Sequence, residues 1–180
     1  MSALAELQHL VRYHAFWKNR LRPNIGESEA TKYAGRRMLV TPVLSNSIHE
    51  PTRTKAHARM LVLAQEMLGE PITHLTLNKD VCCARHRDGR NSSSSSHITF
   101  FGPEGADYTG GELVLEEEGG DRVLSERNVW HSFDGRNTWH NNRPHTGTKF
   151  SVVAYQRKDA AAAKERGKRR AATDAVDKDL

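Results

Sequence analysis

The chain has 180 residues, 37% of them hydrophobic, which is enough for one well-packed domain and short for two. It contains no apolar run of about 18 residues, so a membrane-spanning helix is not expected. The net charge of +5 is unevenly spread, because residues 157–170 alone carry seven basic side chains against two acidic ones.

The first 70 residues predict helices and contain no catalytic motif. Apolar residues recur at a helical period from Ala3 to Arg20. Met38–Leu44 is a short apolar run interrupted by a proline, which is typical of an edge strand. A second helix is expected to open at Pro51 and to close at Gly69. We therefore assign residues 1–70 to a helical support region.

Residues 71–157 have a different character, because short β-like runs follow one another between Gly, Asp, Asn, Ser and Pro. The runs are Thr73–Asn78, Val81–Ala84, His97–Phe101, Glu112–Glu116, Asn128–Phe133 and Phe150–Tyr155. Ser92–Ser96 is interpreted as a flexible polar loop. Helices followed by many short strands predict a mostly β fold with N-terminal helices, and a double-stranded β-helix (jelly roll) accommodates so many strands in about 85 residues.

Cysteine usage indicates a reducing compartment. Cys82 and Cys83 are adjacent, and neighbouring cysteines rarely form a disulfide, while no second pair exists to complete a zinc site. The charges near the N-terminus lie among and after the apolar positions, unlike those of a secretory signal. A cytoplasmic or nuclear location is therefore expected.

A possible metal-binding pair lies in the middle of the chain. His86 and Asp88 are two residues apart, so in an extended segment both side chains leave the same face. One imidazole and one carboxylate supply two of the three ligands in the facial triad of non-haem Fe(II) oxygenases. His-x-Asp also occurs by chance on protein surfaces, so the pair alone is a weak indication.

A later segment supplies the missing ligand type. His140 would be the third ligand, and nine residues further Lys149 starts the last predicted strand with Ser151 on the same face. A cation and a hydroxyl that point together into a barrel suit the distal carboxylate of 2-oxoglutarate. The alternative makes His140 a turn-capping residue and Lys149 an ordinary edge lysine. His131 and His145 would be ligands only in a different register.

The order of these motifs resembles the TET/JBP branch of 2-oxoglutarate/Fe(II) dioxygenases, which oxidise the methyl group of 5-methylpyrimidines in nucleic acid. The matching motifs are Asn78-x-Asp80, His86-x-Asp88-x-x-Asn91, Tyr108-Thr-Gly-Gly-Glu112-Leu, Phe133-Asp-Gly-Arg136 and His140-x3-Pro-x2-Gly-x-Lys149-x-Ser151. They cover about Thr73 to Tyr155. Prolyl and lysyl hydroxylases share the same frame, so the resemblance to the superfamily is more specific than the resemblance to the branch.

The resemblance implies Fe(II), 2-oxoglutarate and O2 as reactants. It implies that His86, Asp88 and His140 hold the iron and that Lys149 with Ser151 anchors the cosubstrate. Lysine departs from the arginine more often found at that position, since it keeps the charge and loses the bidentate fork. Asn78, Asn91 and Arg136 match family positions and are assigned to contacts with the substrate or with the ligands.

The substrate implied by the branch is a 5-methylcytosine or thymine in nucleic acid, with DNA favoured. Residues 158–180 would then form a basic tail that binds phosphate, although a solvated, partly helical end explains the same composition. Glu116, Glu117 and Glu118 disfavour DNA and favour a prolyl-type protein hydroxylase. A binding module without catalysis is the third alternative, and the intact His-x-Asp…His set argues against it.

Overall fold

The computed structural model describes residues 1–14, 39–40, 44–45, 55–89 and 91–157. Two helices and eleven strands follow one another along these residues. They are α1 (Ala3–Arg12), β1 (Leu39–Val40), β2 (Leu44–Ser45), α3 (Lys55–Leu68), β3 (His74–Lys79), β4 (Asn91–Phe101), β5 (Thr109–Gly110), β6 (Leu113–Glu117), β7 (Gly120–Leu124), β8 (His131–Asp134), β9 (Trp139–Asn142), β10 (His145–Thr146) and β11 (Phe150–Arg157).

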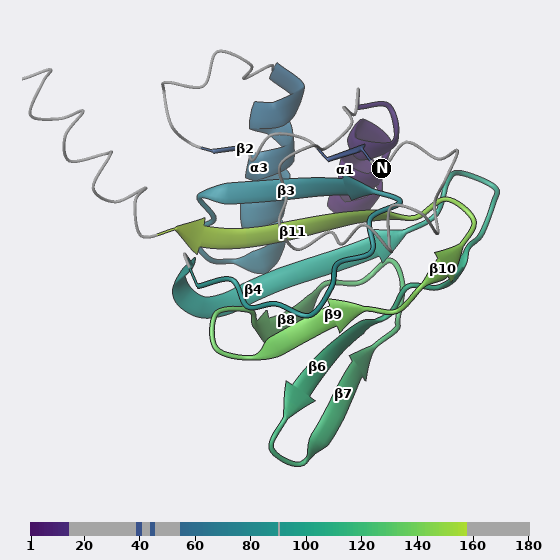
Figure 1. The fold of residues 1–180 in the computed structure, drawn as a ribbon. Coiled ribbons are helices and arrows are strands. Elements are labelled where there is room, and N and C mark those ends of the chain that lie inside the picture. The colour runs from purple at the N-terminus through teal and green to yellow at the C-terminus, as the bar shows by residue number, and fades with distance from the viewer. Residues whose placement is uncertain (15–38, 41–43, 46–54, 90, 158–180) are drawn as a thin grey trace, which may run out of the picture.

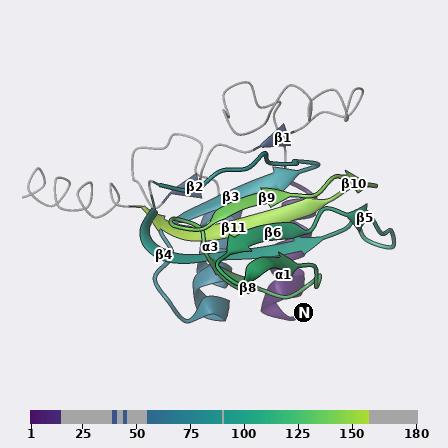
Figure 2. The ribbon, with the colours of Figure 1, turned by 60° about the horizontal axis from the view of Figure 1, so that its bottom comes forward.

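The strands form a layered β structure with the helices on one side (Figure 1). The largest sheet has the order β1-β3-β11-β4-β8, with β2 also pairing with β3, and all its pairs are antiparallel. A second sheet has the order β7-β6-β9, and β5 pairs with β10. Helices α1 and α3 cover the outer face of the large sheet, opposite the smaller sheets (Figures 1 and 2). This arrangement confirms the predicted mostly β jelly roll with N-terminal helices.

Alternating residues of β3 and β11 divide the large sheet into two faces. The helix-facing positions form one apolar cluster with α1 and α3, and the strand members of that cluster are Leu75, Leu77, Phe101, Phe150, Val152 and Ala154. A second cluster of Ile98, Phe100, Leu113, Leu115, Leu124 and Phe133 lies between the large sheet and β6–β9. The first cluster holds the helices in place, and the second closes the barrel beside the site described below.

The N-terminal helix begins as expected and ends early. Ser2 is its N-cap, because the hydroxyl accepts a hydrogen bond from the Ala5 N–H at 3.2 Å. The helix ends at Arg12 instead of continuing to Arg20, since the His14 N–H turns back to the Val11 carbonyl. The predicted range after His14 lies outside the described residues.

The second helix ends as predicted. Leu68 is its last residue, and Gly69 takes a φ of +66°, a conformation that glycine adopts without strain. Its predicted start at Pro51 lies outside the described residues. The expected edge strand appears as β1 and β2, which both pair with β3.

Two strand predictions were wrong near the metal-ligand motif. Val81–Ala84 forms no strand, because Asp80 takes a φ of +53° and ends β3 at that point. Ser92–Ser96 is not a loop, because these residues lie inside the long strand β4. Pairing with β11 and β8 on either side overrides the weak strand preference of serine.

The later strands also differ in their bounds. β8 begins at His131 and not at Asn128, whose φ of +61° interrupts the extended chain. β7 and β9 were not predicted. No helix among the described residues is both long enough and apolar enough to cross a membrane. The division into residues 1–70, 71–157 and 158–180 stays a prediction, and the last range lies outside the described residues.

Candidate metal centre

Three candidate ligands from two segments meet at the edge of the smaller sheet. The extended segment that carries His86 runs antiparallel to β9, and the backbones of His86 and His140 exchange two hydrogen bonds of 2.9 Å. Asp88 Oδ1 lies 3.8 Å from His86 Nε2, and Asp88 Oδ2 lies 3.8 Å from His140 Nε2. Their donor atoms all lie within 4.8 Å of one another, and no other cluster of His, Cys, Asp or Glu among the described residues could hold a metal ion in this way.

Both imidazoles are oriented by the main chain. His86 Nδ1 donates to the Ala84 carbonyl at 2.7 Å, and His140 Nδ1 donates to the Thr138 carbonyl at 2.9 Å. A carbonyl can only accept, so the proton resides on Nδ1 and the Nε2 lone pair faces the cluster. Metal-binding histidines characteristically donate their second N–H in this way.

The donor set fits a divalent first-row metal ion. Bonds of about 2.0–2.2 Å from one ion to nitrogen and oxygen ligands can join donors that are 3.8 Å apart. His140 is nearly inaccessible, with 4% of its side chain exposed, whereas 32% of the Asp88 side chain is exposed. Two histidines and one carboxylate on one side of an ion leave the other side open for reactants.

Gly135 gives the Asp88 carboxylate room to approach. A Cβ atom at position 135 would lie 2.7 Å from Ser96 Oγ and 3.2 Å from Asp88 Oδ2. The Gly135 carbonyl also accepts a hydrogen bond from the Asp88 N–H at 2.7 Å. Any side chain at this position would therefore push against the ligand.

Lys149 lies just before β11 and is buried, with 3% of its surface exposed. Its Nζ donates to the Gly111 carbonyl and lies 5.4 Å from the centre of the Phe100 ring. Burial lowers the pKa of Lys149 to about 8, and the neighbouring Cys83 and Cys82 partly oppose this change. With a pKa of about 8 most of the Lys149 side chain is still protonated at pH 7, and a buried ammonium is a suitable partner for a carboxylate ligand.

Two further buried groups shape the same end of the barrel. Asn78 Nδ2 donates to Ser151 Oγ at 3.1 Å, since the two residues are opposite one another on β3 and β11. The Asp80 carboxylate accepts the Lys149 N–H at 2.8 Å and lies 3.6 Å from His145 Nε2. Sequence reasoning did not assign a role to Asp80, although its position directly after a buried strand was visible.

The remaining two predicted residues, Asn91 and Arg136, lie in different parts of the site. Asn91 Nδ2 donates to Ser96 Oγ at 3.0 Å, and the Asn91 N–H donates to the Asp88 carbonyl at 2.9 Å. Asn91 therefore supports the loop that carries Asp88. Arg136 lies in the turn between β8 and β9 and lines an open cavity beside His86.

The competing histidines lie outside the cluster. His131 Nε2 contacts the Glu126 carbonyl at 2.7 Å, and its ring stacks on Phe100. His145 is buried beside Asp80, with Tyr108 at the edge of its ring. Tyr108 is itself buried, as expected for a packing residue, and burial raises its pKa to about 12.

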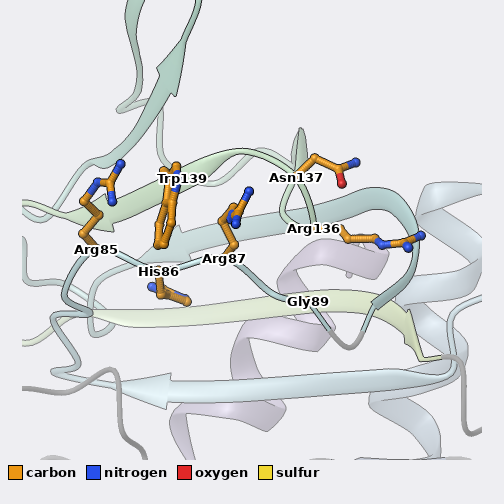
Figure 3. Close-up of a pocket in the computed structure, with 7 residues that line it drawn as sticks. All are labelled: Arg85, His86, Arg87, Gly89, Arg136, Asn137 and Trp139. Atoms are coloured by element: carbon orange, nitrogen blue, oxygen red, sulfur yellow. The ribbon is translucent and has the colours of Figure 1, made fainter.

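Sequence reasoning missed the residues on the outer side of the metal segment. Arg85 and Arg87 lie 3.9 and 4.5 Å from the centre of the Trp139 ring, measured from their guanidinium carbons. The signal that could have revealed them is simple, because both arginines alternate with His86 and Asp88. Figure 3 shows them pointing to the opposite side from His86.

Comparison with known proteins identifies the architecture. A 2-oxoglutarate/Fe(II) oxygenase family oxidoreductase from Burkholderia pseudomallei matches with a TM-score of 0.54 and 16% identity, over 84% of this chain and 77% of the other. A prolyl hydroxylase from Trichoplax adhaerens, in complex with a hypoxia inducible factor peptide fragment, matches with a TM-score of 0.57 and 13% identity, over 90% of this chain and 81% of the other. The fold is that of the 2-oxoglutarate/Fe(II) oxygenases.

At these identities the likeness to the oxygenases establishes the fold alone. No protein-family model matches the chain, and no curated protein matches it. Within that fold, the chemistry of the site follows from the side chains of this protein.

Proposed function

We propose that this protein is a 2-oxoglutarate- and Fe(II)-dependent dioxygenase that hydroxylates a C–H bond. The observation that carries the proposal is the convergence of His86, Asp88 and His140 within a jelly roll, with a buried lysine before the last strand. An Fe(II) ion and 2-oxoglutarate, when bound, supply the activation of O2 for hydroxylation.

The chain's own residues hold and orient these reactants. The two Nε2 atoms and the Asp88 carboxylate take the metal, while the Ala84 and Thr138 carbonyls keep the imidazoles in the required tautomer. Lys149 and Ser151 take the distal carboxylate of the cosubstrate through a charge-assisted and a neutral hydrogen bond. Exposure of Asp88 on one side gives the substrate access to the centre.

We further propose a 5-methylpyrimidine in nucleic acid, with DNA favoured, as the substrate. The motif resemblance, the sequence pI of about 9.4 and the arginines around the cavity beside His86 support it. The target base in a duplex would have to be extruded, because its methyl group is otherwise inaccessible to an enclosed metal.

A prolyl-type protein hydroxylase is the second candidate. The Trichoplax adhaerens enzyme, which has the same fold, was solved with a peptide. The acidic Glu116 and Glu117 on β6 favour this candidate as well, since they lie near the metal segment and repel phosphate.

The test is succinate release with Fe(II) and 2-oxoglutarate, in the presence of methylated DNA, methylated RNA or proline-containing peptides. We expect methylated DNA to stimulate succinate release and to yield a 5-hydroxymethyl product by mass spectrometry. A peptide that gains about 16 Da, the mass of one oxygen atom, while DNA is unchanged would replace the nucleic-acid substrate by the protein substrate. Loss of succinate release with all three substrates would contradict the dioxygenase itself.

A further inference from the structure

A positively charged cavity adjoins the metal centre on its outer side. It has a volume of about 600 Å³ and includes the ligand His86 among its lining residues. Three guanidinium groups, an amide and an indole also line it: Arg85, Arg87, Arg136, Asn137 and Trp139. Within the described part of the chain, its lining includes no carboxylate. The cavity is therefore suited to an anion that lies next to the metal.

Alternation along one extended segment creates this juxtaposition. His86 and Asp88 turn toward the metal, so Arg85 and Arg87 project from the opposite side of the same segment. Figure 3 shows the Trp139 ring between the two arginine side chains, with His86 pointing away from them. A ligand held by these arginines would consequently lie on the far side of the extended segment that carries His86, with the backbone of that segment between the ligand and the metal.

Trp139 restricts the two arginines. Their guanidinium carbons lie 3.9 Å and 4.5 Å from the ring centre, for Arg85 and Arg87 respectively. Such stacking attracts a cation to the ring face and leaves the N–H groups at the edge available for acceptors. Because both guanidinium groups pack against the indole, Trp139 orders the arginines instead of offering a free face to a base.

The two arginines differ in their remaining hydrogen-bonding capacity. Arg85 forms two bonds of 2.7 Å to the Glu116 carboxylate, which also lowers the pKa of Glu116. Arg87 makes no hydrogen bond or ion pair within the portion of the chain that the structure describes. Its contact with Trp139 is a cation–π contact, which leaves its N–H groups unused. Arg87 is therefore the guanidinium whose N–H groups are ready for an incoming anion.

We propose that Arg87, ordered by Trp139 and assisted by Arg136, binds the phosphodiester backbone of a nucleic-acid strand beside the metal centre. This inference rests on the proposed nucleic-acid function and names the residues that would position the strand. The planar guanidinium fork matches two phosphate oxygens. A phosphate backbone is favoured over an acidic peptide because the chain is basic, with a pI of about 9.4 and a cationic segment at residues 157–170.

The acidic hairpin of β6 and β7 gives the bound strand a direction. Glu117 and Asp121 lie on this hairpin beside Glu116, and they repel phosphate. The bound nucleic-acid strand is expected to leave the cavity on the side of Arg136, away from the β6–β7 hairpin.

The test measures the affinity of the full-length protein for a fluorescent single-stranded oligonucleotide by anisotropy at several salt concentrations. Arg87→Gln should weaken binding about tenfold at low salt and lower the log–log salt slope by about 0.7, the value for one lost phosphate contact on a single strand. Arg122→Gln is the control for net charge, because Arg122 is also an exposed arginine but is paired with Glu117 and lies outside the cavity. Unchanged binding by Arg87→Gln, or equal loss in both variants, would overturn the proposal.

A second pair of variants tests the site in the opposite direction. Glu116→Gln should tighten oligonucleotide binding several-fold, because it releases the Arg85 guanidinium at the cavity. Glu117→Gln changes the net charge equally and releases Arg122 on the hairpin, so it should have little effect. Equal tightening in both would show that only total charge matters and would contradict a defined site.

Two further outcomes separate this site from the proposed reaction. The binding assay contains neither Fe(II) nor 2-oxoglutarate, so it is independent of turnover. Arg87-dependent DNA binding together with hydroxylation of peptides alone would sink the proposed nucleic-acid reaction and leave the phosphate site standing. Displacement of the oligonucleotide by an equal charge concentration of polyglutamate would overturn the phosphate assignment and give the site to an acidic peptide.

Discussion

Both faces of β3 and β11 are largely buried, but the buried side chains on the two faces are chemically opposite. On the helix-facing side the buried residues of the two strands are all hydrophobic: Leu75, Leu77, Phe150, Val152 and Ala154. On the barrel side the same strands present mainly polar residues, which are His74, Thr76, Asn78, Ser151 and Tyr155. Burial alone therefore does not distinguish a structural face from a functional one. The chemistry of the buried groups does, because polar groups are costly to bury unless they are paired.

The strongest test of this contrast removes a ligand on the barrel side. Asp88→Ala should reduce turnover by more than about 100-fold, beyond the loss caused by removing an outer hydrogen-bond partner. Stability should change little, because the carboxylate is one-third exposed and its loss opens no core cavity. Succinate release and thermal unfolding are the measurements. Near-normal turnover would contradict the metal centre.

The helix-facing side should respond in the reverse manner. Leu77→Ala should lower the free energy of unfolding by about 2–5 kcal/mol, because Leu77 is fully buried in the cluster with the helices. Thr76→Val, one residue away on the barrel side, should cost less than about 1.5 kcal/mol, since it removes one hydrogen bond to Tyr155. Chemical denaturation compares the two. A larger loss for Thr76→Val would reverse the assignment of the faces.

Lys149 gives a third test of the contrast between the two faces, because it is a charged residue buried inside the barrel. Its pKa is lowered to about 8 by burial, so the folded state binds fewer protons than the unfolded state between about pH 8 and 10.5. Wild-type stability should therefore rise with pH across that window. Lys149→Met should stabilise the protein without ligands by about 1–3 kcal/mol at pH 7, and the gain should disappear by pH 10.5. Destabilisation by Lys149→Met at pH 7 would identify a structural lysine.

Cosubstrate affinity provides the smallest and most specific effect. If 2-oxoglutarate needs the charged ammonium, its affinity should fall about tenfold per pH unit above the Lys149 pKa of about 8. In Lys149→Arg, which keeps its charge, affinity should be lower at pH 7 and nearly constant up to pH 10. Calorimetric titration with a redox-inert metal measures both. A flat profile in the wild type would exclude Lys149 as the anchor.

The sequence predicted the parts of the site that depend on short spacing. His86 and Asp88 share a face because they are two apart in an extended segment, and His140 arrives from a later strand as expected. The helix boundary at Gly69 was also predictable, because glycine alone takes the required conformation without strain. These features are local, so residue type and interval determine them.

The parts that were missed depend on distant partners. Ser92–Ser96 lies inside a strand because β11 pairs with Asn91 and Ser96 and β8 pairs with Ser95 and Ser96, and the serine run itself carries no such signal. β9 is polar, with Trp139 and two asparagines, and it is a strand because β6 lies beside it. Asp80 and Asn128 take positive φ angles at the ends of β-like runs, and nothing in the neighbouring sequence predicts this conformation.

The main-chain partners of the ligand histidines have a consequence for how this site can vary. Ala84 and Thr138 each lie two residues before the histidine that they orient, and each contributes only its carbonyl. A substitution at either position therefore leaves the acceptor in place, whereas a carboxylate partner would be lost with its side chain. The backbone carbonyls thus determine the tautomer of the two ligand histidines. Mutational drift in neighbouring side chains leaves it intact, and only an insertion, a deletion or a proline that redirects the chain removes it.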